Sequence, residues 1–362
     1  MIKKAMIMAA GAGTRLNPLT AKIPKPMVPV ANTPIIELIL RHLQKSGIND
    51  VIANTHYCAE SIHKAFGGKN RLGINFQYVH EKALSGTAGG LKVCESFFEP
   101  GETFIAVSGD ALTNVNIEEL YKKHKKSGAI ASMALTEVPE EEVDQFGVVV
   151  LGENSRIIGF QEKPKREDAK SNLVNTGIYI FETTIFDYIP ANTFYDFAKN
   201  VFPALMKNDE IMCGFKIDDY WNDIGTISQY KASSLELLNA PAIELPYKES
   251  AQGWLAESSV LGKNISVENK ILVGEGSVIE DNVIFKGNNI IGNNCIIKTG
   301  SEIKDSIIWD NAVIEENVIL DGCIIAGNVN IKAGIKLAKD SIVPHDMIIT
   351  KPEDLYKEPI CI

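Results

Sequence analysis

The sequence lacks a membrane-spanning apolar run, and it lacks the positive charge of a nucleic-acid-binding protein. Asp and Glu number 46 against 36 Lys and Arg, so the net charge is −10 at pH 7. Because nucleic-acid binding relies on basic surfaces, this balance excludes broad contact with a phosphate backbone. The absence of an apolar stretch of about 20 residues excludes a membrane helix. We therefore expect no nucleic-acid partner and no membrane partner.

Cysteine is sparse, and no two cysteines form a Cys-x-x-Cys pair. This spacing excludes the usual zinc and redox motifs and indicates reduced, mostly buried thiols. We therefore expect a cytoplasmic protein without a zinc site. The six cysteines stand at positions 58, 94, 213, 295, 323 and 361.

A buried strand followed by two glycines opens the chain. Residues 5–10 are small and apolar, as is typical of the first strand of a parallel sheet. Gly11 and Gly13 then allow a sharp turn and leave backbone N–H groups open to an anion. The dinucleotide-binding spacing would need a third glycine, and the P-loop would need Gly-Lys-Ser/Thr; both are missing here.

Side chains that suit phosphate follow this turn. Thr14 and Arg15 add a hydroxyl and a guanidinium that can hold phosphate oxygens in a planar fork. Lys25 lies between Pro24 and Pro26, which restrict the backbone around it. The pattern predicts a nucleoside triphosphate site. The alternative interpretation is an ordinary strand-to-helix turn, and the cluster of cations favours the phosphate site over it.

Two acidic residues stand where strands are predicted to end. Asp110 follows the apolar segment 104–109, and the carboxyl ends of strands are where open α/β sheets bind ligands. It is a candidate Mg²⁺ ligand or, alternatively, a turn or helix-capping residue. Glu81 precedes a glycine-rich loop at residues 85–90. Its acceptor-only carboxylate would suit the adjacent N–H donors of guanine, unless it is a solvated loop residue.

Strand-like and helix-like segments alternate through residues 1–240, which predicts an α/β domain. Residues 241–253 contain two prolines and charged residues, and we interpret them as a linker. From 254 to 345 the apolar residues recur every six positions with one slip of register, which predicts a hexapeptide-repeat β-helix. Residues 346–362 form a C-terminal tail. The apolar positions are 261, 267, 273, 279, 285, 291, 297 and 303, and then 313, 319, 325, 331, 337 and 343.

The first domain resembles the sugar-nucleotide pyrophosphorylases, which join a sugar 1-phosphate to a nucleotide. The likeness rests on an ordered set of motifs that covers nearly the whole domain. The resemblance implies a Rossmann-like mixed sheet followed by a left-handed β-helix, Mg²⁺ as cofactor, and an NTP and a sugar 1-phosphate as partners. The motifs are Gly-x-Gly-Thr-Arg, Lys-Pro-Met, Gly-Thr-Ala-Gly, Ser-Gly-Asp, Phe-Gly-Val-Val, Glu-Lys-Pro, Asn-x-Gly-Ile-Tyr and Trp-x-Asp-Ile-Gly.

The resemblance also assigns residues to roles. Where the family commonly has Glu-Lys before a Phe-Pro pair, this chain has Phe197-Ala198-Lys199. The contact that the glutamate makes is therefore either missing here or made by Asp196. Asp110 and Asp223 match the Mg²⁺ ligands, and with Arg15 and Lys25 they form the predicted catalytic set. Predicted nucleotide-binding residues are Ala10, Gly11, Gly13, Thr14, Glu81, Gly86 and Thr87, and predicted sugar-phosphate residues are Gly147, Glu162, Lys163 and Asn175.

The substrate pair and the role of the β-helix are less narrowly predicted. The glutamate before Gly-Thr-Ala-Gly favours the guanylyltransferase branch, hence GTP and mannose 1-phosphate. Uridylyl or thymidylyl transfer to glucose 1-phosphate is the alternative. An acetyltransferase activity in the β-helix would need a histidine between coils, and only His345 follows residue 124. A non-catalytic subunit would be expected to have lost the phosphate site. We expect the β-helix to support a homo-oligomer or to carry an effector site.

Overall fold

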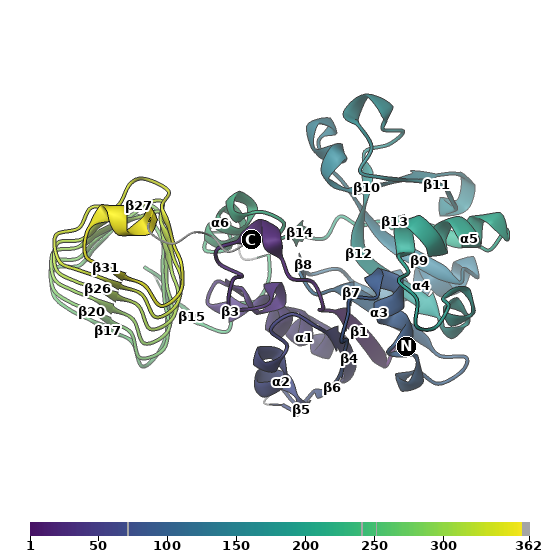
Figure 1. Cartoon of the computed structure of the whole chain (residues 1–362), viewed down its shortest axis with the longest axis horizontal. Coiled ribbons are helices and arrows are strands. Elements are labelled where there is room, and N and C mark those ends of the chain that lie inside the picture. Colours follow the sequence, from purple (N-terminus) through teal and green to yellow (C-terminus); the bar gives the residue numbers. More distant parts are fainter. Residues whose placement is uncertain (71, 240–241, 251, 357–362) are drawn as a thin grey trace. The chain divides into compact units, whose positions relative to one another are not determined.

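The computed structural model describes residues 1–70, 72–239, 242–250 and 252–356, and the chain divides into two compact units (Figure 1). The first unit comprises residues 1–12, 24–27 and 35–223. The second comprises residues 13–23, 28–34 and those from 224 onward. This division differs from the boundary that we predicted at residue 240. The final helix α6 (Ile227–Glu236) belongs to the unit that contains the β-helix.

A ten-stranded mixed sheet is the centre of the first unit. Its strands are Lys4–Met8 (β1), Asp50–Thr55 (β4), Gly68–Lys69 (β5), Asn75–His80 (β6), Thr103–Ser108 (β7), Ala131–Glu137 (β9), Gly147–Leu151 (β10), Ile157–Glu162 (β11), Leu173–Glu182 (β12) and Met212–Lys216 (β13). The strands β7, β1, β4 and β6 lie side by side and run parallel, whereas β12 runs antiparallel to β7. The parallel strands therefore end at one common edge, and the predicted mixed α/β sheet is confirmed.

Amphipathic helices connect the strands. Helix α1 buries its apolar side chains and ends before Gly47, whose φ is +80°. Asn116 caps α4 by accepting a hydrogen bond from the backbone N–H of Glu119. The helices of the first unit are Ile35–Lys45 (α1), Glu60–Phe66 (α2), Gly86–Lys92 (α3), Ile117–Ser127 (α4) and Phe202–Lys207 (α5), and the short strands Ala111–Thr113 (β8) and Trp221–Asp223 (β14) pair with each other.

The second unit contains a three-sided parallel β-helix whose coils are stacked in Figure 1. Each side is one sheet, and we call them sides A, B and C. Side A consists of β15 (Lys248–Ser250), β16 (Gly253–Leu255), β19 (Ile271–Val273), β22 (Asn289–Ile291), β25 (Ile307–Ile308), β28 (Ile324–Ile325) and β30 (Ile342–Val343). Side B consists of β17 (Val260–Leu261), β20 (Val278–Ile279), β23 (Ile296–Ile297), β26 (Val313–Ile314), β29 (Asn330–Ile331) and β31 (Ile348–Ile349). Side C consists of β18 (Ser266–Val267), β21 (Ile284–Lys286), β24 (Glu302–Lys304) and β27 (Ile319–Asp321).

The six-residue period predicted the β-helix but misplaced part of its core. Ile314 and Leu320 are fully buried, whereas Val313 and Ile319, which we expected to face inward, lie outward. The reason is that the spacing between inward residues shortens from six positions to five at two places. These places are between Ile303 and Ile308 and between Leu320 and Ile325. The pairing of β15 and β31 also extends the fold beyond the predicted limits of 254 and 345.

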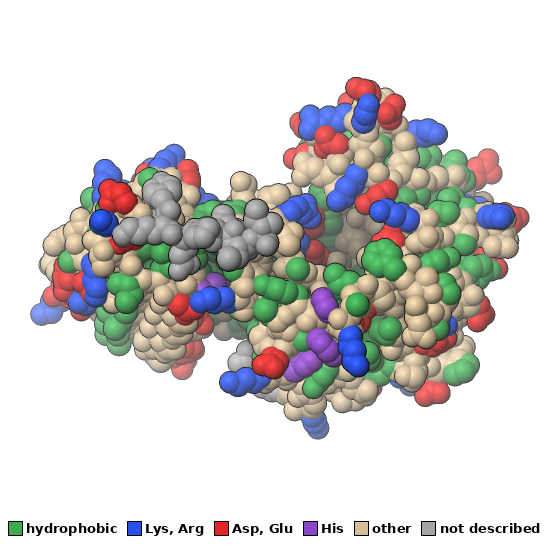
Figure 2. Space-filling model, viewed as in Figure 1, with side chains coloured by type: hydrophobic (Ala, Val, Ile, Leu, Met, Phe, Trp, Pro, Cys, Tyr) green, Lys and Arg blue, Asp and Glu red, His purple; other side chains and the backbone are tan. Residues whose placement is uncertain are grey.

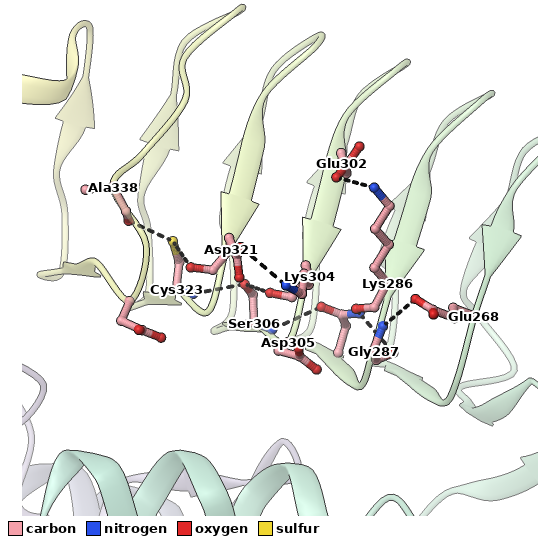
Figure 3. Close-up of polar contacts among 12 residues, drawn as sticks. Glu268, Lys286, Gly287, Glu302, Lys304, Asp305, Ser306, Asp321, Cys323 and Ala338 are labelled. Carbon is pink, nitrogen blue, oxygen red and sulfur yellow. Dashed lines mark hydrogen bonds and ion pairs between the residues drawn. The ribbon is translucent and has the colours of Figure 1, made fainter.

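Small polar side chains join successive coils at one corner. The Ser306 N–H donates to Asn289 Oδ1 over 3.0 Å, and the Cys323 N–H donates to Ser306 Oγ over 3.0 Å (Figure 3). These buried side chains satisfy backbone groups that the corner leaves without ladder partners. Asparagines at positive φ, such as Asn294 and Asn311, form other corners.

The remaining predictions from composition can be compared with the described residues. Cysteines 58, 94, 213, 295 and 323 are free thiols, and all except Cys58 are buried, while Cys361 lies outside the described residues. No helix in the described part of the chain is long and apolar enough to cross a membrane. Acidic and basic side chains are interspersed over the face shown in Figure 2.

Candidate active site at the carboxyl ends of the parallel strands

A cavity of about 440 Å³ lies where the central parallel strands of the first unit end. Met8 closes β1, Asn54 lies near the end of β4, Glu81 follows β6 and Ser108 closes β7. This is the edge at which open α/β sheets bind ligands. The lining consists of Met8, Ala10, Gly11, Lys25, Pro26, Asn54, Glu81, Leu84, Gly86, Thr87, Ser108, Gly109, Asp110, Gly177, Tyr179, Phe194, Asp196 and Phe197.

An ion pair between Lys25 and Asp110 forms the charged centre of the cavity. Lys25 Nζ lies 2.5 Å from Asp110 Oδ2, and Ser108 Oγ donates to Asp110 Oδ1 over 2.6 Å. Burial acts to raise the pKa of the Asp110 carboxyl. The charge of the Lys25 ammonium and the hydrogen bonds from Lys25 and Ser108 outweigh this effect and hold that pKa below its ordinary value. Asp110 is therefore ionised at neutral pH, and its side chain keeps 27% of its surface exposed.

The turn at Asp110 is made possible by a close approach of two strands. A Cβ on Gly109 would lie 2.7 Å from the Met8 carbonyl oxygen, which is closer than real Cβ contacts. The Gly109 N–H donates to that same oxygen over 2.9 Å. Only glycine therefore allows β7 to end against β1 and to place Asp110 in the cavity.

The second predicted metal ligand comes from a distant part of the chain. Strand β14 pairs antiparallel with β8, so that Asp223 lies directly opposite Ala111, the residue after Asp110. Two carboxylates on adjacent backbone segments are hard oxygen donors, which suits Mg²⁺ with phosphate oxygens completing its coordination. Within the described ranges, no three His, Cys, Asp or Glu side chains gather into a metal site. The chemistry of the two carboxylates fits a divalent ion, and metal binding by Asp110 and Asp223 stays a prediction.

A polar network in the wall of the cavity, centred on Asn54 and Glu81, was not predicted from the sequence. Asn54 Oδ1 accepts from the Ala9 N–H over 3.0 Å, and Asn54 Nδ2 donates to Glu81 Oε1 over 2.7 Å. Glu81 Oε2 accepts from both the N–H and the hydroxyl of Ser85. Glu81 thus receives three hydrogen bonds from the protein and is only 5% exposed. The available signal for Asn54 was a polar residue at the end of the apolar run 51–53.

The glycine-rich segment after Glu81 was predicted to be a loop, and this was wrong for most of its length. Residues 86–92 form helix α3, with Gly89 and Gly90 inside it. A Cβ on Gly90 would overlap Asn54 Nδ2, so glycine here serves the close packing of a helix rather than loop freedom. The turn is confined to Ser85 and Gly86, whose φ values are −99° and +81°.

Asp196 lies at the cavity and connects α3 to the next segment. Asp196 Oδ2 accepts from Thr87 Oγ1 over 2.9 Å, and the Thr87 hydroxyl accepts from the Phe197 N–H. The Asp196 carboxylate also caps the π-helical turn at Phe197–Val201. The carboxylate that can take the place of the family's glutamate is thus beside the predicted nucleotide-binding residue Thr87.

Of the predicted sugar-phosphate residues, Gly147, Glu162 and Asn175 lie on β10, β11 and β12, and Lys163 directly follows β11. Gly147 and Glu162 are direct partners in the β10–β11 pair, and a Cβ on Gly147 would lie 2.6 Å from the Phe160 ring. Burial raises the pKa of the Glu162 carboxyl, although neighbouring Lys163 acts to lower it. Asn175 Nδ2 donates to Tyr179 Oη over 2.7 Å. Tyr179 lines the cavity, so Asn175 is one hydrogen bond away from it.

The other predicted phosphate-binding residues belong to the second unit. Gly13 has φ +66°, which confirms the need for glycine, and it precedes the short helix at Thr14–Leu16. Thr20 Oγ1 donates to the Gly13 carbonyl oxygen over 2.9 Å and closes this turn. The Arg15 side chain is exposed. Phosphate binding by Gly13, Thr14 and Arg15 stays a prediction.

Comparisons with known proteins agree with this architecture. A family model described as nucleotidyl transferase matches residues 4–240, and one described as the EIF2B subunit epsilon left-handed β-helix domain matches residues 251–355. The chain is 36% identical over 324 residues to a UTP–glucose-1-phosphate uridylyltransferase of Synechocystis, covering 85% of this chain and 83% of the relative. It is 28% identical over 307 residues to a mannose-1-phosphate guanylyltransferase of Mycobacterium tuberculosis, covering 84% and 79%. A putative glucose-1-phosphate thymidylyltransferase of Bacillus anthracis shares the fold, with a TM-score of 0.59 and 23% identity over 69% of this chain and 98% of that one.

The polar network predicts a specific loss of stability. Asn54→Asp replaces the amide that donates to Glu81 with a second buried carboxylate, so we expect the free energy of unfolding to fall by about 3 kcal/mol at neutral pH. Because a shared proton relieves the repulsion, the loss should shrink as the pH falls toward about 4. Denaturant unfolding at several pH values measures both effects.

Asn75→Asp is the matched control, because Asn75 Nδ2 donates to Asp50 across the same two strands but at an exposed position. We expect this change to cost less than about 0.5 kcal/mol. Equal losses for the two variants would contradict a buried role for the Asn54–Glu81 contact.

Proposed function

We propose that this chain, which belongs to the nucleotidyl transferase family, transfers a nucleotidyl group from an NTP to a sugar 1-phosphate. The observation that carries the proposal is the Lys25–Asp110 pair in the cavity at the ends of β1 and β7. It supplies a cation for phosphate and an ionised carboxylate for a metal ion at one point. The curated relatives support the same class of reaction, since their names specify nucleotidyl transfer to glucose 1-phosphate or mannose 1-phosphate.

The reaction needs no general base from the protein. A phosphate monoester is mostly dianionic at neutral pH because its second pKa is about 6. One of its oxygens can attack the α-phosphorus of the NTP in line, while the bond to the β-phosphate breaks and pyrophosphate leaves. The residues that line the cavity include no histidine or cysteine, which is consistent with this chemistry. Catalysis then depends on positioning and on neutralising charge.

We assign the triphosphate to the glycine turn and its cations. The N–H of Gly11, three residues after the end of β1, would face a phosphate oxygen. Lys25 would offset the charge of the bound triphosphate. An ammonium has three donor hydrogens, so Lys25 can keep its bond to Asp110 while it contacts phosphate. We assign Arg15 to the departing pyrophosphate, because its guanidinium can grip two oxygens together.

We assign the metal to the two carboxylates described above. Asp110 and Asp223 would hold Mg²⁺, which supplies charge neutralisation at the α-phosphate and the incoming phosphate. Lys25 keeps Asp110 ionised, so the carboxylate is ready to bind a cation at neutral pH. On the sugar side, Lys163 would orient the attacking phosphate. Glu162 and Asn175 would bond the hydroxyls, and Gly147 lies directly opposite Glu162 on the paired strand.

For the substrate pair we propose UTP and glucose 1-phosphate. Guanine would need a free acceptor site on each oxygen of Glu81, yet Oε2 already accepts two hydrogen bonds from Ser85, and Oε1 accepts one from Asn54. The 36% identity to the Synechocystis uridylyltransferase supports the same choice. GTP and mannose 1-phosphate form the second candidate pair, which is favoured by the position of Glu81 in the cavity and by the guanylyltransferase relatives.

The proposal predicts a large kinetic effect at the charged centre. Asp110→Asn and Arg15→Ala should each lower kcat/KM at least about 100-fold, or roughly 3 kcal/mol, because both groups act on charge in the transition state. Pyrophosphate release is measured for every pairing of GTP, UTP, dTTP or ATP with glucose 1-phosphate or mannose 1-phosphate. We expect the highest kcat/KM with UTP and glucose 1-phosphate.

Asp144→Asn serves as control, because Asp144 is in an exposed ion pair with Arg166 in the same unit. It should turn over normally. Near-normal turnover of Asp110→Asn would contradict the assigned role. Failure to release pyrophosphate with any pair would instead favour a non-catalytic subunit.

Glu81→Gln separates a structural role from a base-reading role. If Glu81 only holds Asn54 and Ser85, the variant should lower the melting temperature and reduce kcat/KM for GTP and UTP by similar factors. If Glu81 reads guanine, the ratio of kcat/KM for GTP to that for UTP should fall about tenfold or more, since a lost bidentate contact is worth about 1–3 kcal/mol. We expect the first result.

A further inference from the structure

An exposed aromatic side chain, that of Phe194, lines the cavity at the ends of the parallel strands. Phe194 is 67% exposed, and Leu84, which also lines the cavity, is 48% exposed. The aromatic residues that follow Phe194 are anchored, since Tyr195 packs against the core of the first unit and Phe197 is part of it. Phe194 thus contributes little buried area to the fold, and its ring is accessible to a ligand.

The backbone that carries Phe194 is fixed against the start of α3. The Tyr195 N–H donates to the Ser85 carbonyl oxygen over 2.8 Å. The Tyr195 carbonyl oxygen accepts from the N–H groups of Ala88 and Gly89, each over 3.0 Å. These bonds hold the segment without using the Phe194 side chain. A ring on a fixed backbone loses little freedom when a ligand binds, which favours affinity.

The Phe194 ring lies over Gly86, at the turn before α3. A Cβ on Gly86 would lie 3.3 Å from Phe194 Cζ and would overlap the Tyr195 carbonyl oxygen. Gly86 also has a φ of +81°, so the turn requires glycine for two reasons. Phe194 therefore lies at the segment that contains the predicted nucleotide-binding residues Glu81, Gly86 and Thr87.

The lining of the cavity has a charged part and an apolar part. Lys25 and Asp110 form the charged part. Leu84 and Phe194 add apolar surface beside the turn at Gly86. A nucleoside triphosphate is divided in the same way, because the faces of its base are apolar and its phosphates are charged. The ion pair and the exposed ring therefore match the two ends of one ligand.

We propose that the ring of Phe194 stacks on the base of the bound NTP, an inference that rests on the proposed function. Aromatic rings stack on flat π systems in an offset arrangement. Every nucleobase has such a face, so stacking adds affinity without reading the hydrogen-bonding edge of the base. Phe194 therefore holds the base in the cavity, and groups at the edge of the base select which base it is.

Calorimetry with the full chain and Mg²⁺, without a sugar phosphate, tests the stacking contact. Phe194→Ala should raise the Kd of UTP about tenfold, and that of GTP by at least as much, because a purine offers a larger face. Inorganic tripolyphosphate has the three phosphates and no base. Its Kd should be the same for both proteins, which would also show that the variant's phosphate site is intact. An unchanged Kd for UTP, or equal weakening of UTP and tripolyphosphate, would overturn the proposal.

The unaltered chain separates this inference from the proposed function. An unaltered chain that binds no NTP would overturn both of them. If instead the unaltered chain releases pyrophosphate and Phe194→Ala binds UTP equally well, the stacking contact alone is overturned.

Steady-state kinetics distinguish the base from the sugar as the stacking partner, since the face of a sugar ring can also pack on an aromatic ring. Phe194→Ala should raise the KM for UTP and leave the KM for glucose 1-phosphate unchanged. Phe194→Tyr keeps the aromatic face and should return the KM for UTP to within about twofold of the original. A rise in the KM for glucose 1-phosphate alone, or no recovery with Phe194→Tyr, would overturn stacking on the base.

Ile158→Ala is the matched control for loss of an exposed apolar side chain. Ile158 is 61% exposed on β11 of the same unit and is not among the residues that line the cavity. This variant should change neither KM. A rise in the KM for UTP equal to that of Phe194→Ala would show that the effect does not come from a contact in the cavity, and would overturn the proposal.

Discussion

The ion pair between Lys25 and Asp110 is the interaction on which the proposed chemistry depends. A carboxylate that is partly buried at the end of a central strand would ordinarily be driven toward its neutral form. Lys25 and the Ser108 hydroxyl instead keep Asp110 ionised, and Gly109 allows β7 to end close enough to β1 for this to happen. A cationic and an anionic side chain thus lie together at the ends of β1 and β7.

How much could be predicted from the sequence depended on whether the signal was local. Lys25 between prolines, Asp110 after an apolar strand and the six-residue period are local patterns, and they led to the charged centre and to the β-helix. Asn54 was missed because its partners Ala9 and Glu81 are remote in sequence. The inward positions 314 and 320 were missed because two coils are one residue shorter than the others, which only the pairing of strands reveals.

The segment that follows the glycine turn, residues 13–23 with Arg15, belongs to the same compact unit as the β-helix. His345 contacts the Leu19 carbonyl oxygen over 3.1 Å and packs edge-on against Trp309. The one histidine of the β-helix is therefore occupied in a structural contact, which removes the support for an acetyltransferase activity. It also connects the β-helix to the segment that follows the glycine turn.

The central claim is that two carboxylates from distant parts of the chain hold one divalent ion beside the triphosphate. The most direct test is a crystal structure with Mn²⁺ and a non-hydrolysable UTP analogue, in which anomalous scattering locates the metal. We predict a single strong peak bonded to carboxylate oxygens of Asp110 and Asp223, with the Arg15 guanidinium on the β- and γ-phosphates. A metal bound elsewhere, or a triphosphate outside the cavity at the ends of β1 and β7, would contradict the account.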